Sequence, residues 1–331
     1  MLQSFMDCKQ FLSCDWGTSS FRLKLVETST WFTLAEVQNN NGISPTFTFW
    51  KQSGTEQDRF LFFAAIIKSS ISEMESKINK SLSGTPVVIS GMASSSLGMI
   101  NLPYKKLPFK TDGSDVKLHC VKASLDFDHD VIVISGVCSE TDVMRGEETQ
   151  LVGCVQDHQH EEHLYIFPGT HSKHITVKEN SVSAFKTYMT GELFALLSKN
   201  GTLAEAVDVT SALLDEKSIQ SFKQGVEDTM KSNLLHSLFM VRTRFLLHHN
   251  PKELNYNYLS GLLIGHEVKD LINLNLNGIT LVSSNINNHY QMAIQTLNIQ
   301  TPIRLIEDAD VTVKGQFAIL SRNHETVNYF K

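Results

Sequence analysis

The stretch that decides the fold is residues 11–27, which read FLSCDWGTSSFRLKLVE. In its second half Phe21, Leu23 and Leu25 alternate with basic and other residues, and the first half is rich in residue types found in strands. Alternation with a period of two around a turn of small residues is typical of a β-hairpin. We therefore predict two paired strands joined by a turn at residues 17–20.

The same pattern occurs a second time along the chain. The second copy consists of a strand, a turn of small residues and two further strands, at residues 164–167, 168–172, 173–178 and 182–186. Both turns contain the pattern G-T-x-S, at residues 17–20 and 169–172. Because the strand pattern around the turns also matches, we infer an ancient duplication. At about 150 residues per domain, the sequence then divides into domains 1–158 and 159–331.

The pattern of the remaining chain is that of an α/β protein. Short apolar runs at 87–90 and 131–135 end in glycine, which is typical of strands buried on both faces of a sheet. Apolar residues three or four apart predict an amphipathic helix over 56–80. The other predicted elements are strands at 30–37, 279–283 and 303–306, and helices at 191–198 (capped by Thr190), 203–249, 256–274, 287–297 and 310–322.

Composition narrows the class of protein. Hydrophobic residues make up 41% and charged residues 19% of the chain, which excludes a disordered protein. A formal net charge of −6 argues against a nucleic-acid partner, because phosphate binding there depends on clustered Lys and Arg. The five cysteines form no C-x-x-C pair, and we find neither a leader pattern nor an apolar run of membrane-spanning length. We expect a cytoplasmic protein that binds small molecules, with no membrane partner.

Each Gly-Thr turn is a candidate phosphate site. A turn without a Cβ lets main-chain N–H groups reach phosphate oxygens and form an anion nest. One turn per domain suits a nucleotide polyphosphate held from both sides of a cleft, and the candidate residues are Gly17, Thr18, Ser19, Gly169, Thr170 and His171. Asp15, at the end of the first strand, is placed to bind Mg²⁺ directly or through water. For either turn alone an ordinary hairpin turn is the alternative, and for His171 the alternative is a local hydrogen bond.

Longer motifs point to a family. They are DWGTSSFR at 15–22, SGMASS at 90–95 leading to Pro103-Tyr104, DVMRGEETQ at 142–150, PGTHSKH at 168–174, residues 185–197 around MTGEL, and YLSGLLIG at 258–265. These stretches resemble the 2-dehydro-3-deoxygalactonokinase family, within the superfamily of actin, hexokinase and the heat-shock chaperone ATPases. No P-loop, Rossmann glycine motif or protein-kinase signature is present in the sequence. The resemblance implies two ribonuclease H-like domains of the actin/hexokinase type with an interdomain cleft. It also implies ATP- and Mg²⁺-dependent phosphorylation of the C6 hydroxyl of 2-dehydro-3-deoxy-D-galactonate in galactonate catabolism.

The motif at 142–150 supplies candidates for the chemistry. Asp142 is our first choice for the base that takes the hydroxyl proton, and a helix N-cap is its alternative. Arg145 and Arg22 are candidates for the carboxylate of a sugar acid, since a guanidinium holds a carboxylate by two parallel hydrogen bonds. We count Arg145 among the catalytic residues. Lys173 offers a point charge to substrate or phosphate.

The resemblance also implies contacts to the two substrates. For the sugar acid these are Gly91, Met92, Glu147 and Thr190, and for adenosine they are Gly261, Gly265, Ser283 and Ser284. The spacing of Gly261 and Gly265 by itself indicates close approach of either another backbone or a ligand. This chain has His174, and Ser283-Ser284-Asn285, where family members usually carry tryptophan and a terminal glycine.

Several alternatives stay open. The substrate can be another 2-keto-3-deoxy or aldonic acid, because the motifs define phosphate chemistry better than sugar stereochemistry. A nucleotide- or sugar-acid-binding protein without turnover is the third hypothesis, and a homodimer stays open as the oligomeric state. The histidine-rich run 158–163 is interpreted as a linker, because structural metal sites take ligands from more than one rigid segment.

Overall fold

The computed structural model describes residues 8–53, 58–156, 162–208, 215–283 and 286–323. The chain divides into two compact units. The first unit consists of Met1–Gln159, Val177–Ala184 and Ala309–Lys331, and the second of His160–Thr176 and Phe185–Asp308. The predicted division lay at a single cut after residue 158. The observed units differ in that two later segments return to the first unit.

The first unit contains a six-stranded sheet in the order β3-β2-β1-β4-β8-β7. The strands are β3 (Thr33–Asn39), β2 (Phe21–Glu27), β1 (Gln10–Trp16), β4 (Val87–Gly91), β8 (Val131–Ile134) and β7 (Leu118–Val121). β1 pairs antiparallel with β2 from Gln10↔Glu27 to Trp16↔Phe21, and it pairs parallel with β4. The hairpin predicted from residues 11–27 is therefore confirmed.

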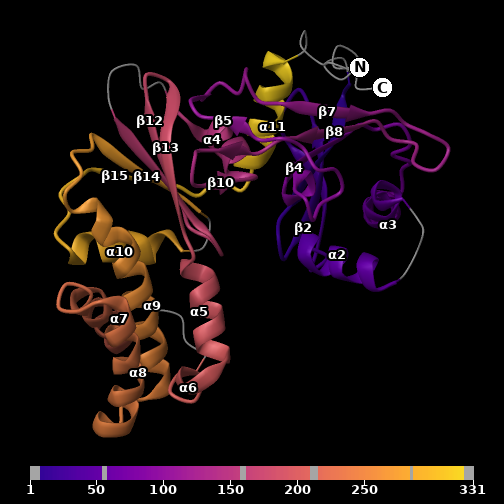
Figure 1. Cartoon of the computed structure of the whole chain (residues 1–331). Coiled ribbons are helices and arrows are strands. Elements are labelled where there is room, and N and C mark those ends of the chain that lie inside the picture. Colours follow the sequence, from indigo (N-terminus) through magenta and orange to yellow (C-terminus); the bar gives the residue numbers. More distant parts are fainter. Residues whose placement is uncertain (1–7, 54–57, 157–161, 209–214, 284–285, 324–331) are drawn as a thin grey trace. The chain divides into compact units, whose positions relative to one another are not determined.

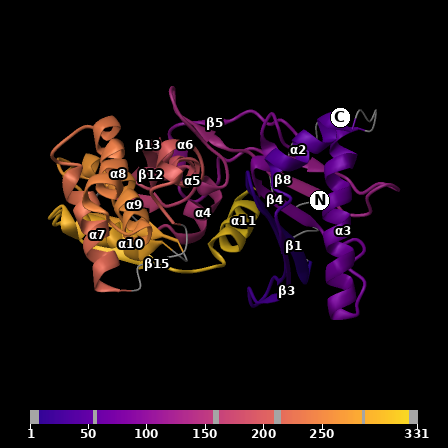
Figure 2. The same ribbon diagram turned by 90° about the horizontal axis from the view of Figure 1, so that it is seen from below.

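Two helices cover opposite faces of this sheet (Figure 2). On one face, α3 (Arg59–Ile78) buries Phe63, Ile67 and Met74 in the core. On the other face, α11 (Val311–Arg322) places Gln316 so that its Nε2 donates to Cys14 O and Ser90 Oγ, each at 3.0 Å. The apolar spacing of α3 was visible in the sequence, whereas a helix at α2 (Ile43–Gln52) was not predicted.

The crossing of α4 with α11 explains why the end of the chain belongs to the first unit. α4 (Glu147–Cys154) packs on α11 through two glycines. A Cβ at Gly153 would lie 1.9 Å from Val311 O, and one at Gly315 would lie 1.8 Å from Thr149 O. No other residue allows the two backbones to approach so closely.

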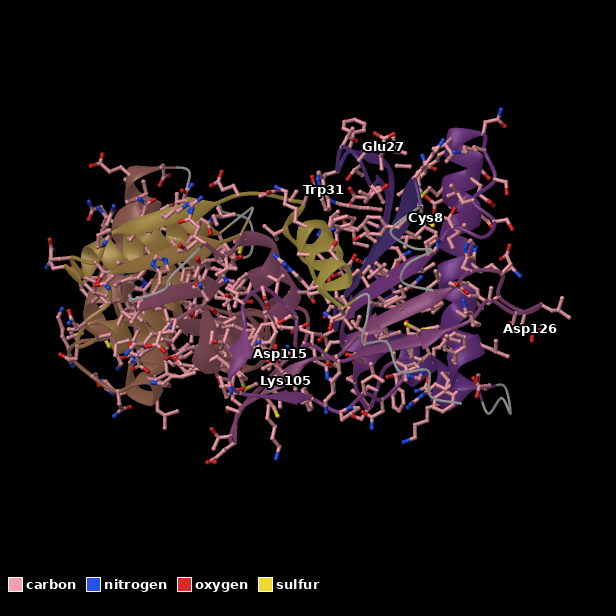
Figure 3. All side chains as sticks on the ribbon, turned by 90° about the horizontal axis from the view of Figure 1, so that it is seen from above. Cys8, Glu27, Trp31, Lys105, Asp115 and Asp126 are labelled. Atoms are coloured by element: carbon pink, nitrogen blue, oxygen red, sulfur yellow. The ribbon has the colours of Figure 1, made fainter. Side chains whose placement is uncertain are left out.

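A small sheet in the order β10-β9-β5 completes the first unit. Its strands are β10 (Val143–Met144), β9 (Val137–Cys138) and β5 (Lys105–Lys106), and a 3₁₀-helix, η1 (Met92–Ser94), follows β4. An ion pair of 3.0 Å between Lys105 Nζ and Asp115 Oδ2 ties β5 to the loop that leads into β7 (Figure 3). The motif at 142–150 begins in this sheet, at β10, and continues into α4.

The second sheet repeats the order of five strands of the first, and its sixth strand, β6 (Phe109–Lys110), lies at the opposite edge from β7. The sheet runs β15-β14-β11-β12-β13-β6, with β15 (Ile303–Ile306), β14 (Gly278–Val282), β11 (His163–Phe167), β12 (Ser172–Lys178) and β13 (Ser181–Tyr188). β11 corresponds to β1 and pairs parallel with β14, as β1 does with β4. The far end of the β12–β13 hairpin, 177–184, lies in the first unit, where Ser181 and Val182 pair with β6.

In both sheets five strands therefore follow the order 3-2-1-4-5, which is the ribonuclease H-like arrangement. The predicted fold class, an α/β protein with two ribonuclease H-like sheets, is confirmed. The matching order also supports the duplication inferred from the two turns.

Helices make up most of the rest of the second unit. They are α5 (Thr190–Lys199), α6 (Gly201–Ala204), α7 (Glu216–Asp228), α8 (Leu234–His248), α9 (Lys252–Val268), η2 (Lys269–Leu271) and α10 (Asn287–Thr296). Figure 1 shows α7, α8 and α9 side by side. The single helix predicted over 203–249 was wrong, because Asp215 and Asn233 cap new helices by accepting from Ser218 N and His236 N. Residues 209–214 lie outside the described ranges.

Among the described helices, none combines the length and the apolarity that crossing a lipid bilayer requires.

Candidate functional site

The first Gly-Thr turn is anchored to α2, the helix that follows β3. Gly17 N donates to Ser20 O at 2.9 Å, while Gly17 O and Thr18 O accept from the first residues of α2, Ile43 and Ser44. A Cβ at Gly42 would lie 2.4 Å from Thr18 O, so the turn can dock only on a glycine. Within the described ranges, the main-chain N–H groups of Thr18 and Ser19 donate no hydrogen bond to the protein. These two donors suit an anion nest.

Asp15 lies at the root of this turn among other charges. In the register of the sheet, Asp15 lies opposite Arg22 on β2 and opposite Ser90 on β4. Burial raises the pKa of Asp15, the nearby charge of Glu147 raises it further, and Arg22 and Lys24 oppose both effects. Two neighbouring carboxylates suit a divalent cation, because Mg²⁺ takes one or two carboxylates alongside water and phosphate oxygens. No group of three or more metal-binding side chains occurs in the part of the chain that the structure describes.

Three segments of the first unit meet beside Asp15. Gly91 ends β4 with a φ of 91°, and a Cβ there would lie 2.7 Å from Trp16 O. Gly146, with a φ of 109°, begins α4 and would place a Cβ 3.3 Å from Gly91 Cα. The fold thus brings the predicted substrate residues Gly91, Met92 and Glu147 to the carboxyl ends of β1 and β4, where ligands bind in open α/β sheets.

Arg145 is buried without an anionic partner among the described residues. It is 9% exposed, its Nη1 donates to Ser94 Oγ at 2.7 Å, and its Nη2 donates to Leu102 O at 3.0 Å. The guanidinium carbon lies 3.9 Å from the centre of the Tyr104 ring, and Nε has no hydrogen-bond partner. A buried guanidinium held only by neutral acceptors and a ring is a favourable place for a carboxylate. Arg22 differs, because it forms an exposed ion pair of 3.3 Å with Glu36.

Asp142 lies in the turn between β9 and β10 and does not cap a helix. Its Oδ1 accepts from Val143 N at 2.7 Å, and its main-chain N–H donates to Ser139 Oγ at 2.9 Å. The N-cap of α4 is Gly146, and Glu148 closes that end by accepting from Gly146 N. The helix-cap alternative for Asp142 was therefore wrong, and its role as a base stays a prediction.

The second Gly-Thr turn is held by α5. Glu192 N donates to Thr170 O at 3.0 Å, and His171 Nε2 lies 2.5 Å from Glu192 Oε2. A Cβ at Gly191 would lie 2.4 Å from Gly169 O, whereas a Cβ at Gly169 would meet nothing within 4 Å. Lys173, which is 4% exposed, donates from Nζ to His171 O at 3.1 Å. The side-chain hydrogen bond of His171 therefore goes to a side chain of α5 and not to the loop itself, and a contact of His171 with phosphate stays a prediction.

Thr190 does not cap α5. The N-cap residue is Met189, which makes no side-chain cap bond, and Thr190 is the first residue of the helix. Its hydroxyl donates to Glu267 Oε2. The predicted cap was wrong, because Thr190 already lies inside the helix, and its hydroxyl donates to this buried carboxylate instead of accepting from a main-chain N–H group of the helix end.

The predicted adenosine residues have packing roles in the structure. A Cβ at Gly261 would lie 2.0 Å from Phe222 O, and one at Gly265 would lie 3.0 Å from Val226 Cα, so α7 is the backbone that approaches these glycines. Ser283 follows β14 and donates from its main-chain N–H to Ile306 O at 3.1 Å. Ser284, and most of the histidine-rich run 158–163, lie outside the described residues. An adenosine contact at these positions stays a prediction.

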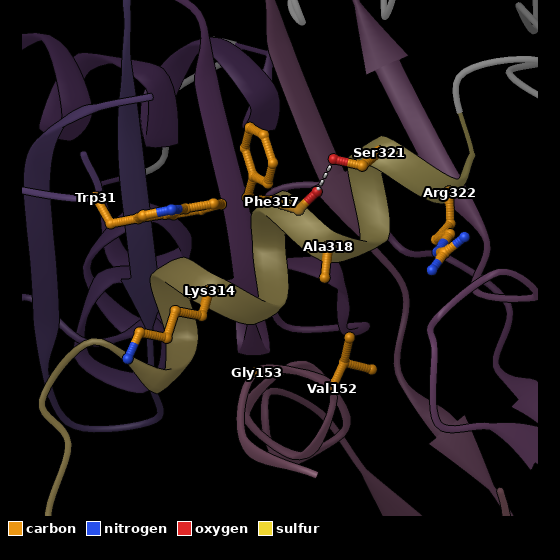
Figure 4. A pocket seen from close by; sticks show the side chains of 8 residues that line it. All are labelled: Trp31, Val152, Gly153, Lys314, Phe317, Ala318, Ser321 and Arg322. Atoms are coloured by element: carbon orange, nitrogen blue, oxygen red, sulfur yellow. Dashed lines mark hydrogen bonds between the residues drawn. The ribbon is translucent and has the colours of Figure 1, made fainter. Parts of the chain in front are cut away.

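The first unit also contains a cavity of about 510 Å³ away from these residues (Figure 4). It is lined by Trp31, Val152, Gly153, Lys314, Phe317, Ala318, Ser321 and Arg322. The rings of Trp31 and Phe317 meet edge to face at 4.2 Å. None of the predicted site residues lines this cavity, so we do not include it in the candidate site.

Comparison with known proteins decides the family. The family model described as 2-keto-3-deoxy-galactonokinase matches residues 15–319. The chain belongs to this family. The match includes both Gly-Thr turns and the motif at 142–150, so the family predicted from the sequence motifs is confirmed.

Individual relatives agree with membership of the 2-keto-3-deoxy-galactonokinase family. A probable 2-dehydro-3-deoxygalactonokinase of Rhizobium meliloti (strain 1021) is 28% identical over 321 residues, which cover 94% of this chain and 96% of the relative. The 2-dehydro-3-deoxygalactonokinase of Escherichia coli (strain K12) is 33% identical over 221 residues, which cover 64% of this chain and 71% of the relative. A crystal structure of a Sinorhizobium meliloti protein provisionally assigned the same activity superposes with a TM-score of 0.75 and 27% identity, covering 97% of this chain and 100% of that one.

Three residues of this 2-keto-3-deoxy-galactonokinase family member were missed by sequence reasoning. Gly42 closes the run Asn39-Asn40-Asn41-Gly42, and its docking role was accessible from that turn signal. Glu192 lies within the MTGEL stretch in the first turn of α5, and nothing local indicates its contact with His171. Glu267 carries no sequence signal, because its partners come from distant segments.

Proposed function

We propose that this protein transfers the γ-phosphoryl group of ATP to the C6 hydroxyl of 2-dehydro-3-deoxy-D-galactonate, giving the 6-phosphate and ADP. The observation that carries the proposal is the pair of Gly-Thr turns at equivalent positions of two sheets with the same strand order. Membership of the 2-keto-3-deoxy-galactonokinase family supplies the substrate class.

Both turns bind phosphate oxygens in this proposal. The main-chain N–H groups of Thr18 and Ser19 supply donors from the first unit, and the turn at Gly169 and Thr170 supplies them from the second. Neither Gly17 nor Gly169 has a positive φ. Glycine therefore serves these turns by leaving room for a ligand, and not by adopting a conformation that other residues avoid. Hydrogen bonds from main-chain N–H groups to an anion are of the strong, charge-assisted kind.

Asp15 and Glu147 are the residues that would hold Mg²⁺. When bound, the ion neutralises charge on the phosphate oxygens. Burial raises the pKa of Asp15, and the nearby charge of Glu147 raises it further, so a cation at this position would favour the ionised form of Asp15. A phosphoryl-transfer site needs this arrangement because its catalysis consists mainly of positioning and charge neutralisation.

Arg145 and Asp142 act on the sugar acid. The buried guanidinium of Arg145 receives the substrate carboxylate, and its Nε supplies a donor that no protein group uses within the described residues. The C6 oxygen attacks the γ-phosphorus, the bond from that phosphorus to the bridging oxygen of ADP breaks, and Asp142 accepts the hydroxyl proton. We also propose a cytoplasmic location, where ATP is available to the reaction.

The experiment that tests the function is ADP release measured with a panel of sugar acids. We expect turnover with 2-dehydro-3-deoxy-D-galactonate to exceed that with its epimers and with aldonic acids, and ³¹P–¹H correlation of the product to place phosphorus on C6. Preferred turnover of another acid would change the substrate. Nucleotide binding without ADP release for any acid would favour a binding protein without turnover.

A further inference from the structure

A buried carboxylate lies directly behind the second Gly-Thr turn. Glu267, on α9, is 2% exposed and accepts four hydrogen bonds. Its Oε1 lies 2.6 Å from Ser172 Oγ and 2.9 Å from His174 Nε2, while Oε2 lies 2.8 Å from Tyr290 OH and accepts from Thr190 Oγ1. Tyr290 OH also lies 3.3 Å from Ser172 Oγ, which closes the cluster.

Such a group is costly to place in a protein core. A carboxylate removed from water is tolerated only when its oxygens are fully hydrogen-bonded. Three of the donor residues, Ser172, His174 and Tyr290, are buried, and the fourth, Thr190, is the first residue of α5. Burial, together with the charge of Glu267, raises the pKa of Tyr290 well above 10, which keeps its hydroxyl protonated. An apolar cluster would fill the same space at lower cost, so the arrangement of the donors needs an explanation.

The donors come from the elements that define the second turn. Ser172 and His174 are on β12, which begins immediately after His171, and Thr190 is the first residue of α5. The start of α5 in turn contacts the turn itself, through Glu192 N to Thr170 O and the close approach of Gly191 to Gly169 O. The carboxylate of Glu267 is therefore hydrogen-bonded to both β12 and α5, the two elements that hold the turn.

We propose that Glu267 is a positioning residue for nucleotide phosphate, acting by holding β12 and α5 so that the turn at Gly169 and Thr170 keeps its geometry. The inference rests on the proposed function, because it requires that this turn bind ATP. Glu267 touches no substrate in this account. Its effect reaches the phosphates only through the main chain of the turn, and small displacements of such donors are expensive.

The test compares Glu267→Gln, Glu267→Ala and Ser172→Ala with a matched control. Asp228 is also a buried carboxylate of the second unit, at 5% exposure, and it accepts from Tyr258 OH at 2.7 Å, Gln224 Nε2 at 3.0 Å and Lys231 Nζ at 2.8 Å. None of these partners belongs to β12, α5 or the turn. Asp228→Asn thus removes a comparable buried charge without touching the proposed path.

We expect Glu267→Ala to raise the KM for ATP at least about tenfold while the KM for the sugar acid changes less than about twofold. Glu267→Gln keeps one acceptor oxygen but turns an NH2 group toward two of the four donors, so it raises the KM for ATP by less than Glu267→Ala but measurably, and Ser172→Ala, which leaves three donors, also gives a smaller increase. Asp228→Asn lowers the melting temperature but leaves the KM for ATP unchanged. If Glu267→Ala does not fold, Ser172→Ala and Glu267→Gln carry the comparison.

Two results would overturn the inference. One is an unchanged KM for ATP in folded Glu267 and Ser172 variants, and the other is an equal shift in Asp228→Asn, which would make the role of Glu267 purely structural. Gly169→Val separates these outcomes from a failure of the proposed function. If Gly169→Val impairs ATP use and the Glu267 variants do not, only the positioning role fails. If Gly169→Val has no effect, the phosphate site itself is wrong.

Discussion

The two Gly-Thr turns offer the sharpest test, because valine at either glycine changes ligand access without straining the fold. A Cβ at Gly169 meets nothing within 4 Å, and a Cβ at Gly17 lies 3.5 Å from Ser20 Oγ, which is an ordinary contact. Neither glycine has a positive φ, so valine causes no backbone strain of that kind. We therefore expect the melting temperatures of Gly169→Val and Gly17→Val to lie within a few degrees of that of the parent protein.

Their effect on ATP follows from the hydrogen bonds they obstruct. A hydrogen bond to a charged group contributes about 1.5 to 3 kcal/mol, so blocking a single N–H to phosphate contact raises the KM for ATP roughly ten- to a hundredfold. Because the turns occupy equivalent positions in the two sheets, we expect losses of similar size from the two substitutions. Gly169→Ala, which adds one methyl group, is the matched control and loses less.

The assay is steady-state ADP release at varied ATP, with thermal unfolding followed by circular dichroism on the same samples. The reasoning is refuted if Gly169→Val is folded and retains the parent values of KM for ATP and kcat. In that case the second turn is only a hairpin, and the functional meaning of the repeat is lost. Loss of folding in either variant would contradict the open space found around these glycines.

Three further predictions follow from the first unit. Asp142→Asn lowers kcat at least about a hundredfold with ATP binding nearly intact, as for a lost acid-base group, and near-normal turnover would move the base to another residue, with Asp15 next. Asp15→Ala weakens MgATP more than metal-free ATP in calorimetric titrations, because the carboxylate acts through the ion, and equal loss of both ligands would mark Asp15 as structural. Burial, with the charge of Glu147, raises the pKa of Glu148 from 4.5 to about 8. The folded form then keeps a proton that the unfolded form releases, so the free energy of unfolding falls as pH rises from 4.5 to about 8. We expect Glu148→Gln to flatten this fall in melting temperatures measured across that range, and an unchanged slope would assign the pH dependence to other groups.

Local patterns in the sequence determined the framework of this protein. Alternation around residues 17–20 and 169–172 is a property of consecutive residues, and it predicted both hairpins correctly. The apolar spacing of α3 and the buried runs of β4 and β8 are equally local. Because each turn consists of consecutive residues, the sequence also located the two candidate phosphate turns, although α2 and α5 hold them in place. The long motifs, among them the one at 142–150, indicated the family.

Only the tertiary structure decided which side chains act together. Contacts with Ser94, Leu102 and Tyr104 shield the side chain of Arg145 from water. These residues are distant from Arg145 in the sequence, so no periodic pattern predicts the contacts. Capping by Asp215 and Asn233 divides a stretch that apolar spacing alone made into one helix. The donors to Glu267 come from β12, α5 and α10, and no pattern of neighbouring residues predicts their convergence. Local backbone preference and hydrophobic period act between near neighbours, whereas burial of charge depends on contacts that exist only once the chain has folded.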